Sequence, residues 1–573
     1  MKYLFSIFLL ILFKLTIAQE EFPKNYFISP VKFPIYLAGN FGELRNNHFH
    51  AGLDIKTQGV IGKEVYAAAE GYVSRINVSP YGYGKALYIT HPNGYTTVYG
   101  HLNQYSEKIE AVVKARQYQK ESFNIAIYLM PNEIKVQKGE LVAYSGNTGG
   151  SGGPHLHFEI RKSSNSHPYN PLFFGFDIKD QRAAEIYSIK IYPLDEHSLI
   201  FGKNEAKRFV ASGQNGKYRL NTTQPISLIG NFGFGIESID RMDETHNTYG
   251  LHNVKLWLDS SLIFEQEIKE FAFDEGRYLN ALIDYEFYMK TKKRIQRSYR
   301  LAGNNLRFFK TLVNNGEVKI KDGDEVKMTY HLSDYHGNVA QLNFDLFGAA
   351  MENNTPVSPI KEGETKRHFS YREKNTFMRD NLLLVIPPYV LYEDLLFTYK
   401  KEEDHPKLVS PLYWIHNHYT PLHSYIDISI KHGNLTEKQK KQALIVSTTN
   451  GIGFTAEGGN WNGDNISVKT RSFGGYGIAL DSIPPRITPL NIFPNANMSK
   501  KGSIRIKVSD NLSGIKSYRA EVDGEWILME YEPKQQLLFH NFDGRIKEGL
   551  HQFKIVVSDG VGNKSTYESS FII

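Results

Sequence analysis

Residues 149–160 read GGSGGPHLHFEI, and this stretch decides the fold of the first part of the chain. After the glycine run, polar and apolar side chains alternate, which is typical of a β-strand with one buried face. One face then carries His155, His157 and Glu159, and the other carries apolar side chains. Because glycine allows close backbone approach, the run before the strand predicts a cleft wall without bulk.

A second segment, HFHAGLDI at residues 48–55, shows the same alternation. If it forms a strand, His50 and Asp54 point the same way, because residues two apart share a face. Gly52 lies between them and has no side chain, which leaves a gap that an ion could fill. The segment therefore predicts a second set of metal-ligating groups.

A third segment, YGHL at residues 99–102, closes a strand that begins at Tyr95 and supplies His101. Two histidines and one carboxylate, with one coordination position left for water, form a recurring catalytic zinc set. Such a metal lowers the pKa of bound water to about 7 and polarises a carbonyl. Two further histidines nearby would transfer protons and stabilise an oxyanion. Each motif alone is a weak signal, since a His-x-His pair is more often a surface or packed pair.

Together, in this order and with these glycines, the segments resemble the lysostaphin/LytM-type zinc endopeptidases of bacterial cell walls. The resemblance covers about residues 38–162. Besides the three segments it includes Gly62–Val73 with Ala67 and Gly71, Lys138–Val142, and Gly146–Gly149.

This resemblance implies that His50, Asp54 and His157 bind Zn²⁺ and that His101 and His155 are the catalytic pair. All five residues are present, which argues against a non-catalytic member. It also implies an antiparallel β-sheet with a central groove, and hydrolysis of peptide bonds in peptidoglycan stems or cross-links. One catalytic histidine would act as general base and the other would stabilise the oxyanion; the sequence leaves open which does which.

The chain departs from the family between Leu102 and Ile134, where the family usually has a short link. We interpret about residues 103–133 as an insertion, with helix-forming composition over 106–123. Because it would reshape the edge of the groove, the substrate specificity stays open.

The amino-acid composition limits the number of domains, the residues that could hold a metal, and the kinds of partner. The chain has 573 residues, 67 Lys+Arg, 61 Asp+Glu and no cysteine. At roughly 150 residues per domain, about four domains are expected. Without cysteine there is no disulfide scaffold, thiol nucleophile, Cys-based zinc finger or iron–sulfur cluster, so His and carboxylates must hold any metal. A net charge of +6 is small for this length and favours no nucleic-acid partner.

The first 18 residues have the pattern of a secretory signal peptide. Lys2 gives a basic start, Leu4–Phe13 is an apolar run broken only by Ser6, and Ala18 ends a stretch suited to cleavage. A buried N-terminal strand is the alternative. We expect export to the periplasm or cell envelope, with secretion also open, and no transmembrane segment after cleavage.

The rest of the chain predicts a mainly β protein, in which the peptidase domain is followed by about three β-sandwich, Ig-like domains. Residues 235–238 (GIES) resemble 514–517 (GIKS), and residues 333–338 (SDYHGN) echo 558–563 (SDGVGN). We interpret these short matches as two Ig-like sandwiches, the first with an insertion around 278–309; chance similarity is the alternative. The expected segments are a signal peptide (1–18), the zinc endopeptidase domain (19–180), an Ig-like sandwich (181–352), a β-rich domain (353–483) and a C-terminal Ig-like domain (484–573).

Other histidines and Glu159 have simpler readings. His48 is interpreted as an outer or exposed residue, and His91 as part of a turn. Glu159 either orients His157 or His101, or is a solvated carboxylate at a strand end. The group His416–His418 has strand spacing but no carboxylate partner, so a packed aromatic surface is favoured over a second metal site.

The sequence therefore favours an exported zinc metalloendopeptidase acting on peptidoglycan. A wall-binding or scaffold protein without catalysis is the first alternative. A secreted zinc peptidase acting on proteins is the second. The C-terminal β-domains carry no catalytic motif, and we expect them to position the enzyme, restrain it, or bind an envelope protein partner.

Overall fold

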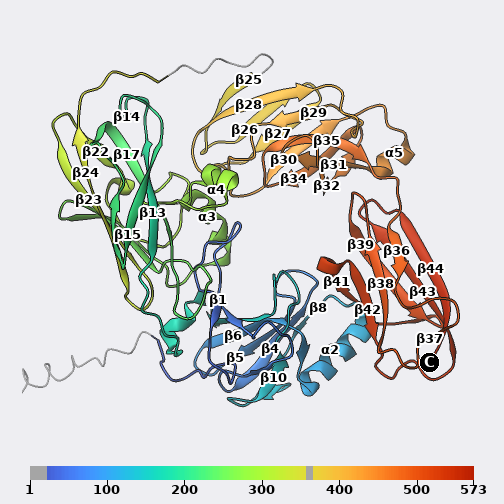
Figure 1. Cartoon of the computed structure of the whole chain (residues 1–573). Coiled ribbons are helices and arrows are strands. Elements are labelled where there is room, and N and C mark those ends of the chain that lie inside the picture. Colours follow the sequence, from blue (N-terminus) through green and yellow to red (C-terminus); the bar gives the residue numbers. More distant parts are fainter. Residues whose placement is uncertain (1–21, 356–364) are drawn as a thin grey trace, which may run out of the picture.

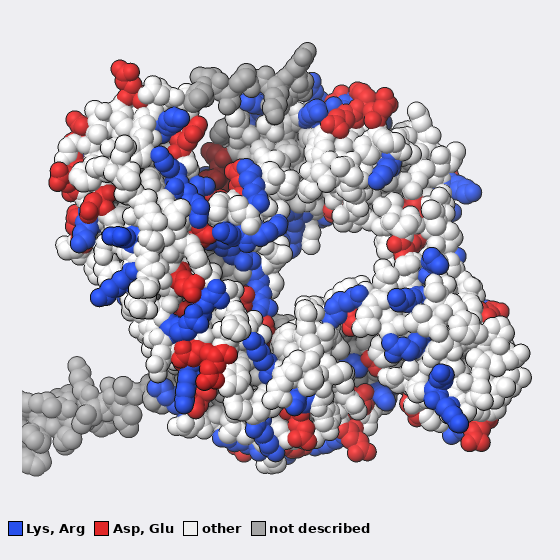
Figure 2. All heavy atoms as spheres, viewed as in Figure 1, with Lys and Arg blue, Asp and Glu red and all other residues white. Residues whose placement is uncertain are grey.

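The computed structural model describes residues 22–355 and 365–573, so the expected signal peptide lies outside the described residues. The fold is mainly β, as predicted, with an N-terminal sheet followed by further β units. We call these the first unit (residues 22–178), the second (185–348), the third (365–480) and the fourth (486–573). Together they form a ring around an open centre, which the space-filling view retains (Figures 1 and 2).

The first unit contains a 9-stranded antiparallel sheet. Its main path runs β1 (Leu37–Gly39), β2 (Leu53–Lys56), β11 (His155–Lys162), β6 (Tyr95–Leu102), β5 (Lys85–Thr90), β4 (Gly71–Val78) and β8 (Ile125–Tyr128). β12 (Pro168–Tyr169) pairs with β11, and β9 (Lys135–Val136) pairs with β4. A 3-stranded sheet of β3 (Glu64–Tyr66), β10 (Leu141–Tyr144) and β7 (Gln104–Tyr105) packs on the same core.

The predicted strand at residues 155–160 forms and becomes β11, between β2 and β6. Its apolar side chains Leu156, Phe158 and Ile160 have no exposed surface. Burying three such side chains contributes roughly 1.5–3 kcal/mol each, which anchors the opposite, polar face of the strand. The short helix η1 (Pro171–Phe174) then closes the unit.

The expected insertion after Leu102 contains the helix α2 (Glu107–Lys120) and the strand β8. Ile109 and Val113 anchor the helix in the core of the first unit. The other side of α2 faces the fourth unit (Figure 1). The insertion is therefore a part of the ring as well as of the first unit.

The second unit is one 12-stranded sheet that closes on itself. Its long strand β17 pairs antiparallel with β13 and also pairs in parallel with β24, the last strand of the unit. Its strands are β13 (Glu185–Pro193), β14 (Leu199–Ile200), β15 (Lys207–Gln214), β16 (Lys217–Leu220), β17 (Ile226–Ile239), β18 (Asn253–Leu258), β19 (Ser261–Glu267), β20 (Gln296–Arg297), β21 (Phe309–Leu312), β22 (Val318–Ile320), β23 (Glu325–Ser333) and β24 (Val339–Gly348).

Between β19 and β21 the chain leaves this sheet and forms η2 (Phe273–Tyr278), α3 (Leu279–Leu282) and α4 (Tyr285–Thr291). A further short turn, η3 (Val313–Gly316), follows β21. Leu279, Leu282 and Phe308 share a buried cluster with Phe41 and Phe49 of the first unit. The segment therefore packs against the loop that precedes β2.

The third and fourth units are each built from two sheets around one core. The third has β25 (Thr365–Phe369), β26 (Asn375–Arg379), β27 (Leu382–Ile386), β28 (Leu395–Glu402), β29 (Leu412–Ile415), β30 (Ile426–Lys431), α5 (Glu437–Gln442), β31 (Ala443–Thr448), β32 (Thr455–Gly458), β33 (Asn460–Asn462), β34 (Asn465–Thr470) and β35 (Gly474–Leu480). The fourth has β36 (Arg486–Pro489), β37 (Ala496–Asn497), β38 (Ser503–Ser509), β39 (Ile515–Val522), β40 (Glu525–Trp526), β41 (Glu530–Glu532), η4 (Pro533–Gln535), β42 (Leu537–Asn541), β43 (Leu550–Asp559) and β44 (Lys564–Ile572).

The ring closes where the fourth unit contacts α2 and the loops of the first unit. Tyr118 of α2 packs edge-on against Trp526 and donates a hydrogen bond to Asp543 at 2.9 Å. Lys85 Nζ forms an ion pair with Glu530 at 2.8 Å. Within residues 22–355 and 365–573, every helix is too short or too polar to cross a lipid bilayer.

Candidate active site

Three neighbouring strands bring the predicted site residues together. β11 lies between β2 and β6, and its register places His157 opposite Asp54 on one side and Gly100 on the other. A side chain at position 100 would press on His157, because an added Cβ would lie 3.3 Å from the Cβ of that histidine. The glycine therefore leaves room for the imidazole.

The segment around His50 differs from the prediction in two respects. β2 begins only at Leu53, so His50 lies in the loop before the strand and is not held by strand alternation. Gly52 is needed for close packing rather than for leaving a gap for an ion, because an added Cβ would lie 2.2 Å from the carbonyl oxygen of Phe158. The buried cluster formed by the preceding loop and residues 279–308 holds this loop in place.

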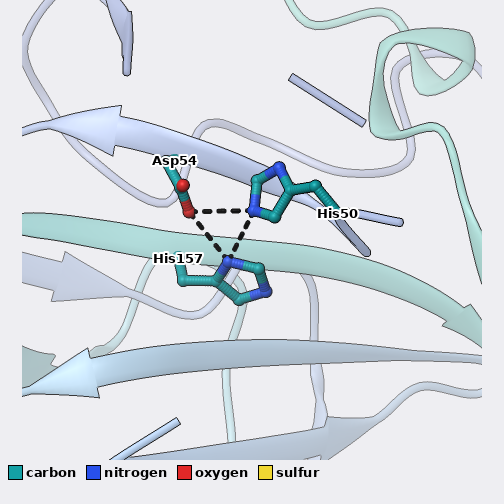
Figure 3. Close-up of side chains that lie close together, drawn as sticks. All are labelled: His50, Asp54 and His157. Atoms are coloured by element: carbon teal, nitrogen blue, oxygen red, sulfur yellow. Dashed lines mark hydrogen bonds and ion pairs between the residues drawn. The ribbon is translucent and has the colours of Figure 1, made fainter. Parts of the chain in front are cut away.

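His50, Asp54 and His157 point toward one another (Figure 3). His50 Nε2 lies 3.0 Å from Asp54 Oδ1 and 3.1 Å from His157 Nδ1, and His157 Nδ1 lies 2.8 Å from Asp54 Oδ1. All three side chains are buried. Two imidazole nitrogens and one carboxylate oxygen converging in this way form a set that can hold a metal ion.

In His50 and His157, the ring nitrogen that points away from the centre is also hydrogen-bonded. His50 Nδ1 donates to the carbonyl oxygen of Asn40 at 2.7 Å, which leaves the lone pair on Nε2 facing the centre. His157 Nε2 donates to Glu159 Oε1 at 2.7 Å, which directs Nδ1 toward the centre. Partners of this kind fix the tautomer and the orientation of a metal-binding imidazole. Of the two readings of Glu159, the structure shows the orienting one, and the carboxylate is fully buried.

Two arginines complete this outer layer, and the sequence contained no motif that indicates them. Arg45 Nη2 lies 2.6 Å from Asp54 Oδ2, the carboxylate oxygen that does not contact the histidines. Arg161 Nε lies 2.5 Å from Glu159 Oε2 and compensates this buried charge. Their positions depend on the tertiary fold and on the β11 register.

The two predicted catalytic histidines lie beside the group of His50, Asp54 and His157. The rings of His101 and His155 have centroids 4.8 Å apart, and His101 and His157 have centroids 5.8 Å apart. His155 Nε2 lies 3.3 Å from Asp54 Oδ1 and is buried without a hydrogen-bond partner. The structure therefore brings all five predicted residues into one site.

His101 owes its direction to an irregularity in β6. The pairing between β5 and β6 shifts register between Lys85 and Leu87, and His101 has a φ of 58°, in the left-handed region. Such a bulge redirects a side chain and often occurs beside active sites. His101 Nδ1 donates to Thr148 O at 2.8 Å, and His155 Nδ1 donates to Gly153 O at 2.8 Å. In each ring Nδ1 is therefore bound to the backbone, and Nε2 is the nitrogen available for proton transfer.

Because of burial and neighbouring charges, the pKa values of these groups differ widely. Burial, followed by repulsion from His157 and His155, lowers the pKa of His101 to about 3, so this ring is neutral at physiological pH. Burial opposes protonation of His157 as well, but hydrogen bonds to Asp54 and Glu159 outweigh it and raise its pKa to about 9. Burial disfavours the charge on Glu159, yet Arg161 and His157 lower its pKa to about 2.

The remaining predicted candidates lie outside the group. His48 is exposed, with Nδ1 donating to the carbonyl oxygen of Asn46. His91 packs in its turn between Glu70 O and Thr97. His416 contacts Thr420 and ring-stacks within the third unit, in agreement with the packed reading.

Two stretches, residues 48–119 and 124–171, match the sequence pattern of Peptidase family M23. They contain all five site residues and the surrounding strands. The chain carries an M23 peptidase domain. In addition, residues 366–481 match the pattern of the Zu5-like domain and coincide with the third unit.

Two of the curated relatives of the M23 domain are named as DD-peptidases, and one of these names includes peptidoglycan. The chain is 32% identical over 123 residues to the DD-carboxypeptidase/endopeptidase Mpg of Neisseria meningitidis serogroup B, 22% of each chain. It is 33% identical over 111 residues to the peptidoglycan DD-endopeptidase ShyA of Vibrio cholerae serotype O1, 19% of this chain and 20% of the relative. The match therefore spans about a fifth of the length of these relatives.

Among solved structures, the catalytic domain of the antimicrobial peptidase lysostaphin from Staphylococcus simulans is 22% identical. The match covers 23% of this chain and 86% of that one, with a TM-score of 0.18. The residues that match the M23 family lie within the first unit.

Proposed function

We propose that this protein is an exported zinc metalloendopeptidase that hydrolyses peptide bonds in peptidoglycan stems or cross-links. The convergence of His50, Asp54 and His157 beside His101 and His155 is the observation that carries the proposal. The names of the M23 relatives support the substrate class. The apolar run within the first 18 residues supports export.

The donor set suits zinc. His50 Nε2, Asp54 Oδ1 and His157 Nδ1 lie within 2.8–3.1 Å of one another, so all three donor atoms can face one ion. Zinc in such a set supplies Lewis-acid polarisation of a carbonyl and lowers the pKa of water. Glu159 and the carbonyl of Asn40 orient the two imidazoles, and Arg45 holds the second oxygen of the aspartate.

The chain's own contribution to hydrolysis is proton transfer and charge stabilisation by His101 and His155. Each ring has its Nδ1 proton bound to a backbone carbonyl, so each presents Nε2 to the reacting groups. A neutral Nε2 accepts a proton from the attacking water, and a protonated one donates to an oxyanion or a leaving amine. The partial burial of the pair excludes bulk water and strengthens both interactions.

The decisive experiment compares purified wild-type protein with His155→Ala and His157→Ala on isolated peptidoglycan. Wild type should release soluble muropeptides, and removal of metal by a chelator should stop the release. His155→Ala should abolish release and retain zinc, whereas His157→Ala should lose both. His48→Ala is the matched control, since His48 is exposed and outside the group, and it should retain activity and metal.

Other results would decide against the proposal. Full activity of His155→Ala would refute its catalytic role. Binding of peptidoglycan without any turnover would favour a wall-binding scaffold. Cleavage of casein-like substrates but not of peptidoglycan would favour a peptidase acting on proteins. Mass spectrometry of the released muropeptides identifies the bond that is cut.

A further inference from the structure

A row of alternating aromatic and arginine side chains crosses the 9-stranded sheet of the first unit. We call it the aromatic–arginine ladder, and it consists of Phe273, Arg161, Tyr88, Arg75 and Tyr128. The guanidinium carbon of Arg161 lies 4.5 Å from the ring centroid of Phe273 and 5.6 Å from that of Tyr88. That of Arg75 lies 4.9 Å from the centroid of Tyr88 and 5.4 Å from that of Tyr128. Each arginine therefore contacts two rings at cation–π distance.

The strand register explains why these residues form a row. Tyr128 of β8 lies opposite Arg75 of β4, and Arg75 lies opposite Tyr88 of β5. Tyr88 in turn lies opposite Val98 of β6, which lies opposite Glu159 of β11. Residues directly opposite one another point to the same face of a sheet, so the row lies on the face that carries the site residues of β11. Four strand spacings separate β8 from β11, which is roughly 19 Å.

Both ends of the ladder are exposed aromatic rings. Phe273 is 47% exposed and Tyr128 is 72% exposed, whereas Tyr88 and Arg161 between them are buried. Phe273 comes from η2 of the second unit, and Tyr128 comes from the insertion after Leu102. Because the buried part of the ladder holds both rings in place, a ligand that contacts them loses little entropy in ordering them.

Arg75 has hydrogen-bonding capacity that the protein does not use. Its Nη2 lies 3.5 Å from Asn77 Oδ1, and its Nε is buried without a hydrogen-bond partner. Arg161, by contrast, donates from Nε to Glu159 and from Nη2 to the hydroxyl of Tyr83. A guanidinium carries five N–H donors, so Arg75 keeps donors for a ligand while Arg161 compensates the buried carboxylate.

Tyr83 connects the ladder with the proposed catalytic residues. Its ring centroid lies 5.1 Å from that of His157, and the guanidinium carbon of Arg161 lies 5.9 Å from the Tyr83 centroid. The ladder and the proposed metal site are thus parts of one continuous surface. A long ligand seated on the ladder lies beside the five site residues.

The chemistry of this surface suits a carbohydrate chain. Sugar rings present C–H groups on their faces, which pack on aromatic rings, and oxygens at their edges, which accept from a guanidinium. An extended peptide would need a free strand edge, whereas the ladder crosses the strands and offers side chains only. A polyanion would need several uncompensated cations, but Arg161 is already paired with Glu159.

We propose that the aromatic–arginine ladder binds the glycan strand of peptidoglycan, with sugar rings on Phe273 and Tyr128 and hydrogen bonds from Arg75. The proposal rests on the proposed peptidase function and deepens it. The ladder holds the glycan while the stem peptide attached to it reaches His101 and His155. The insertion and the second unit each supply one end of this surface, which gives both a role in substrate binding.

The first test measures binding alone, with chitotetraose, a chain of four β-1,4-linked N-acetylglucosamine units, titrated into the full-length protein. Tyr128→Ala and Phe273→Ala should each weaken binding roughly 3–10-fold, as expected for the loss of one stacking contact. Tyr128→Phe should bind as wild type does, because it keeps the ring. Tyr425→Ala is the matched control, since Tyr425 is 45% exposed and stacks on Arg471 at 3.9 Å in the third unit.

The second test separates the ladder from the catalytic chemistry. On cross-linked muropeptides that carry glycan, Tyr128→Ala should raise KM roughly 3–10-fold and leave kcat unchanged. On cross-linked stem peptides without glycan, both constants should equal those of wild type. If wild type cleaves neither substrate, the proposed function fails, and chitotetraose binding still decides the role of the ladder.

Three results would overturn the proposal. The first is the absence of chitotetraose binding by wild type at millimolar concentration. The second is equal binding by wild type and the variant that combines Tyr128→Ala with Phe273→Ala. The third is an equal rise in KM for the substrate without glycan, which would assign the ladder to the peptide instead.

Discussion

His157 donates a hydrogen bond from Nε2 to Glu159 Oε1 at 2.7 Å, and Glu159 is fully buried. Arg161 contacts the other carboxylate oxygen at 2.5 Å. The imidazole of His157, the carboxylate of Glu159 and the guanidinium of Arg161 therefore form a chain along one face of β11. The chain orients Nδ1 of His157 toward the centre and increases its basicity.

We expect Glu159→Gln to lower the zinc affinity about 10–100-fold, because the amide is a weaker acceptor and leaves Arg161 uncompensated. Competition with a fluorescent zinc chelator measures this affinity. Glu64→Gln, at an exposed position at the start of β3, is the control and should bind zinc as wild type does. An unchanged affinity in Glu159→Gln would show that the buried chain does not act on the metal site.

Zinc binding should release a proton. Burial disfavours the charged form of His157, but Asp54 and Glu159 outweigh burial and raise its pKa from 6.5 to about 9 in the metal-free protein. At pH 7 the ring is therefore protonated, and Nδ1 must lose its proton before it can bind a metal. Calorimetry in buffers of different ionisation enthalpy should show release of about one proton per zinc at pH 7, and less above pH 9. Heats independent of the buffer would contradict this assignment.

The raised pKa of His157 also determines how the stability of the metal-free protein varies with pH. A histidine whose folded pKa is raised stabilises the folded state fully below its unfolded value of 6.5, and this contribution is lost as the pH rises through about 9. The free energy of unfolding of metal-free wild type should therefore fall between pH 6.5 and 9. Zinc-loaded protein should lack this component, because the bound ring carries no extra proton. Urea titrations at several pH values measure the difference.

The buried carboxylate of Asp240 should also make the stability of the protein depend on pH. Asp334, Asp180 and Arg182 are the charges that act on Asp240, and His336 lies beside Asp180. Burial and the two acids raise the pKa of Asp240 from 3.8 to about 8. The folded state then binds more protons than the unfolded state between these values, so its stability should fall as the pH rises from about 4 to about 8.

A comparison of wild type with Asp240→Asn checks this pH dependence. Asp240→Asn should flatten the decline in the free energy of unfolding over that range, because the amide does not titrate. A decline of equal size in Asp240→Asn would assign it to other groups.

The strand that decides the site was predictable because its signal is local. Alternation from His155 to Ile160 needs only the two-residue period, and the structure has the expected strand β11. The same reasoning was wrong at His50, because a short apolar loop held by residues 279–308 resembles a strand in its alternation. Gly52 was misread for a related cause, since its neighbour, the carbonyl of Phe158, belongs to another strand.

Features that depend on contacts between segments far apart in the sequence could not be predicted. The bulge that turns His101 depends on the register between β5 and β6. The group of Asp180, Asp334 and His336 forms only because segments far apart in the sequence meet in the fold. The insertion was predicted as a change to the groove edge, but the structure also makes its helix a contact surface for the fourth unit.

The contact between the fourth unit and the M23 domain lies beside His155, at the wall of the proposed catalytic site. Lys534 Nζ donates to the carbonyl oxygen of Ser151 at 3.2 Å, and Ser151 Oγ lies 3.2 Å from His155 Nδ1. Nearby, the ion pair between Lys85 and Glu530 is largely buried. Burial opposes the charge on Lys85, but Glu530 outweighs it and raises the pKa of the lysine.

We expect Glu530→Ala combined with Lys534→Ala to release the fourth unit from this wall. Removing one partner of a largely buried ion pair leaves the other charge uncompensated, and such losses reach about 3–5 kcal/mol for fully buried pairs. Small-angle scattering should show a larger radius of gyration for the double variant, and limited proteolysis should cut faster between the third and fourth units. Release of muropeptides should increase, because the wall of the site becomes accessible to a bulky polymer.

Arg519→Ala is the matched control, since Arg519 pairs with Glu121 across the same contact but is exposed. Exposed pairs contribute about 0–1 kcal/mol, so this variant should keep the closed ring and the wild-type rate. An open ring with unchanged muropeptide release would show that the fourth unit does not restrain the site. An open ring with loss of binding to intact peptidoglycan would instead assign the fourth unit a targeting role, because the catalytic residues themselves are untouched by either substitution.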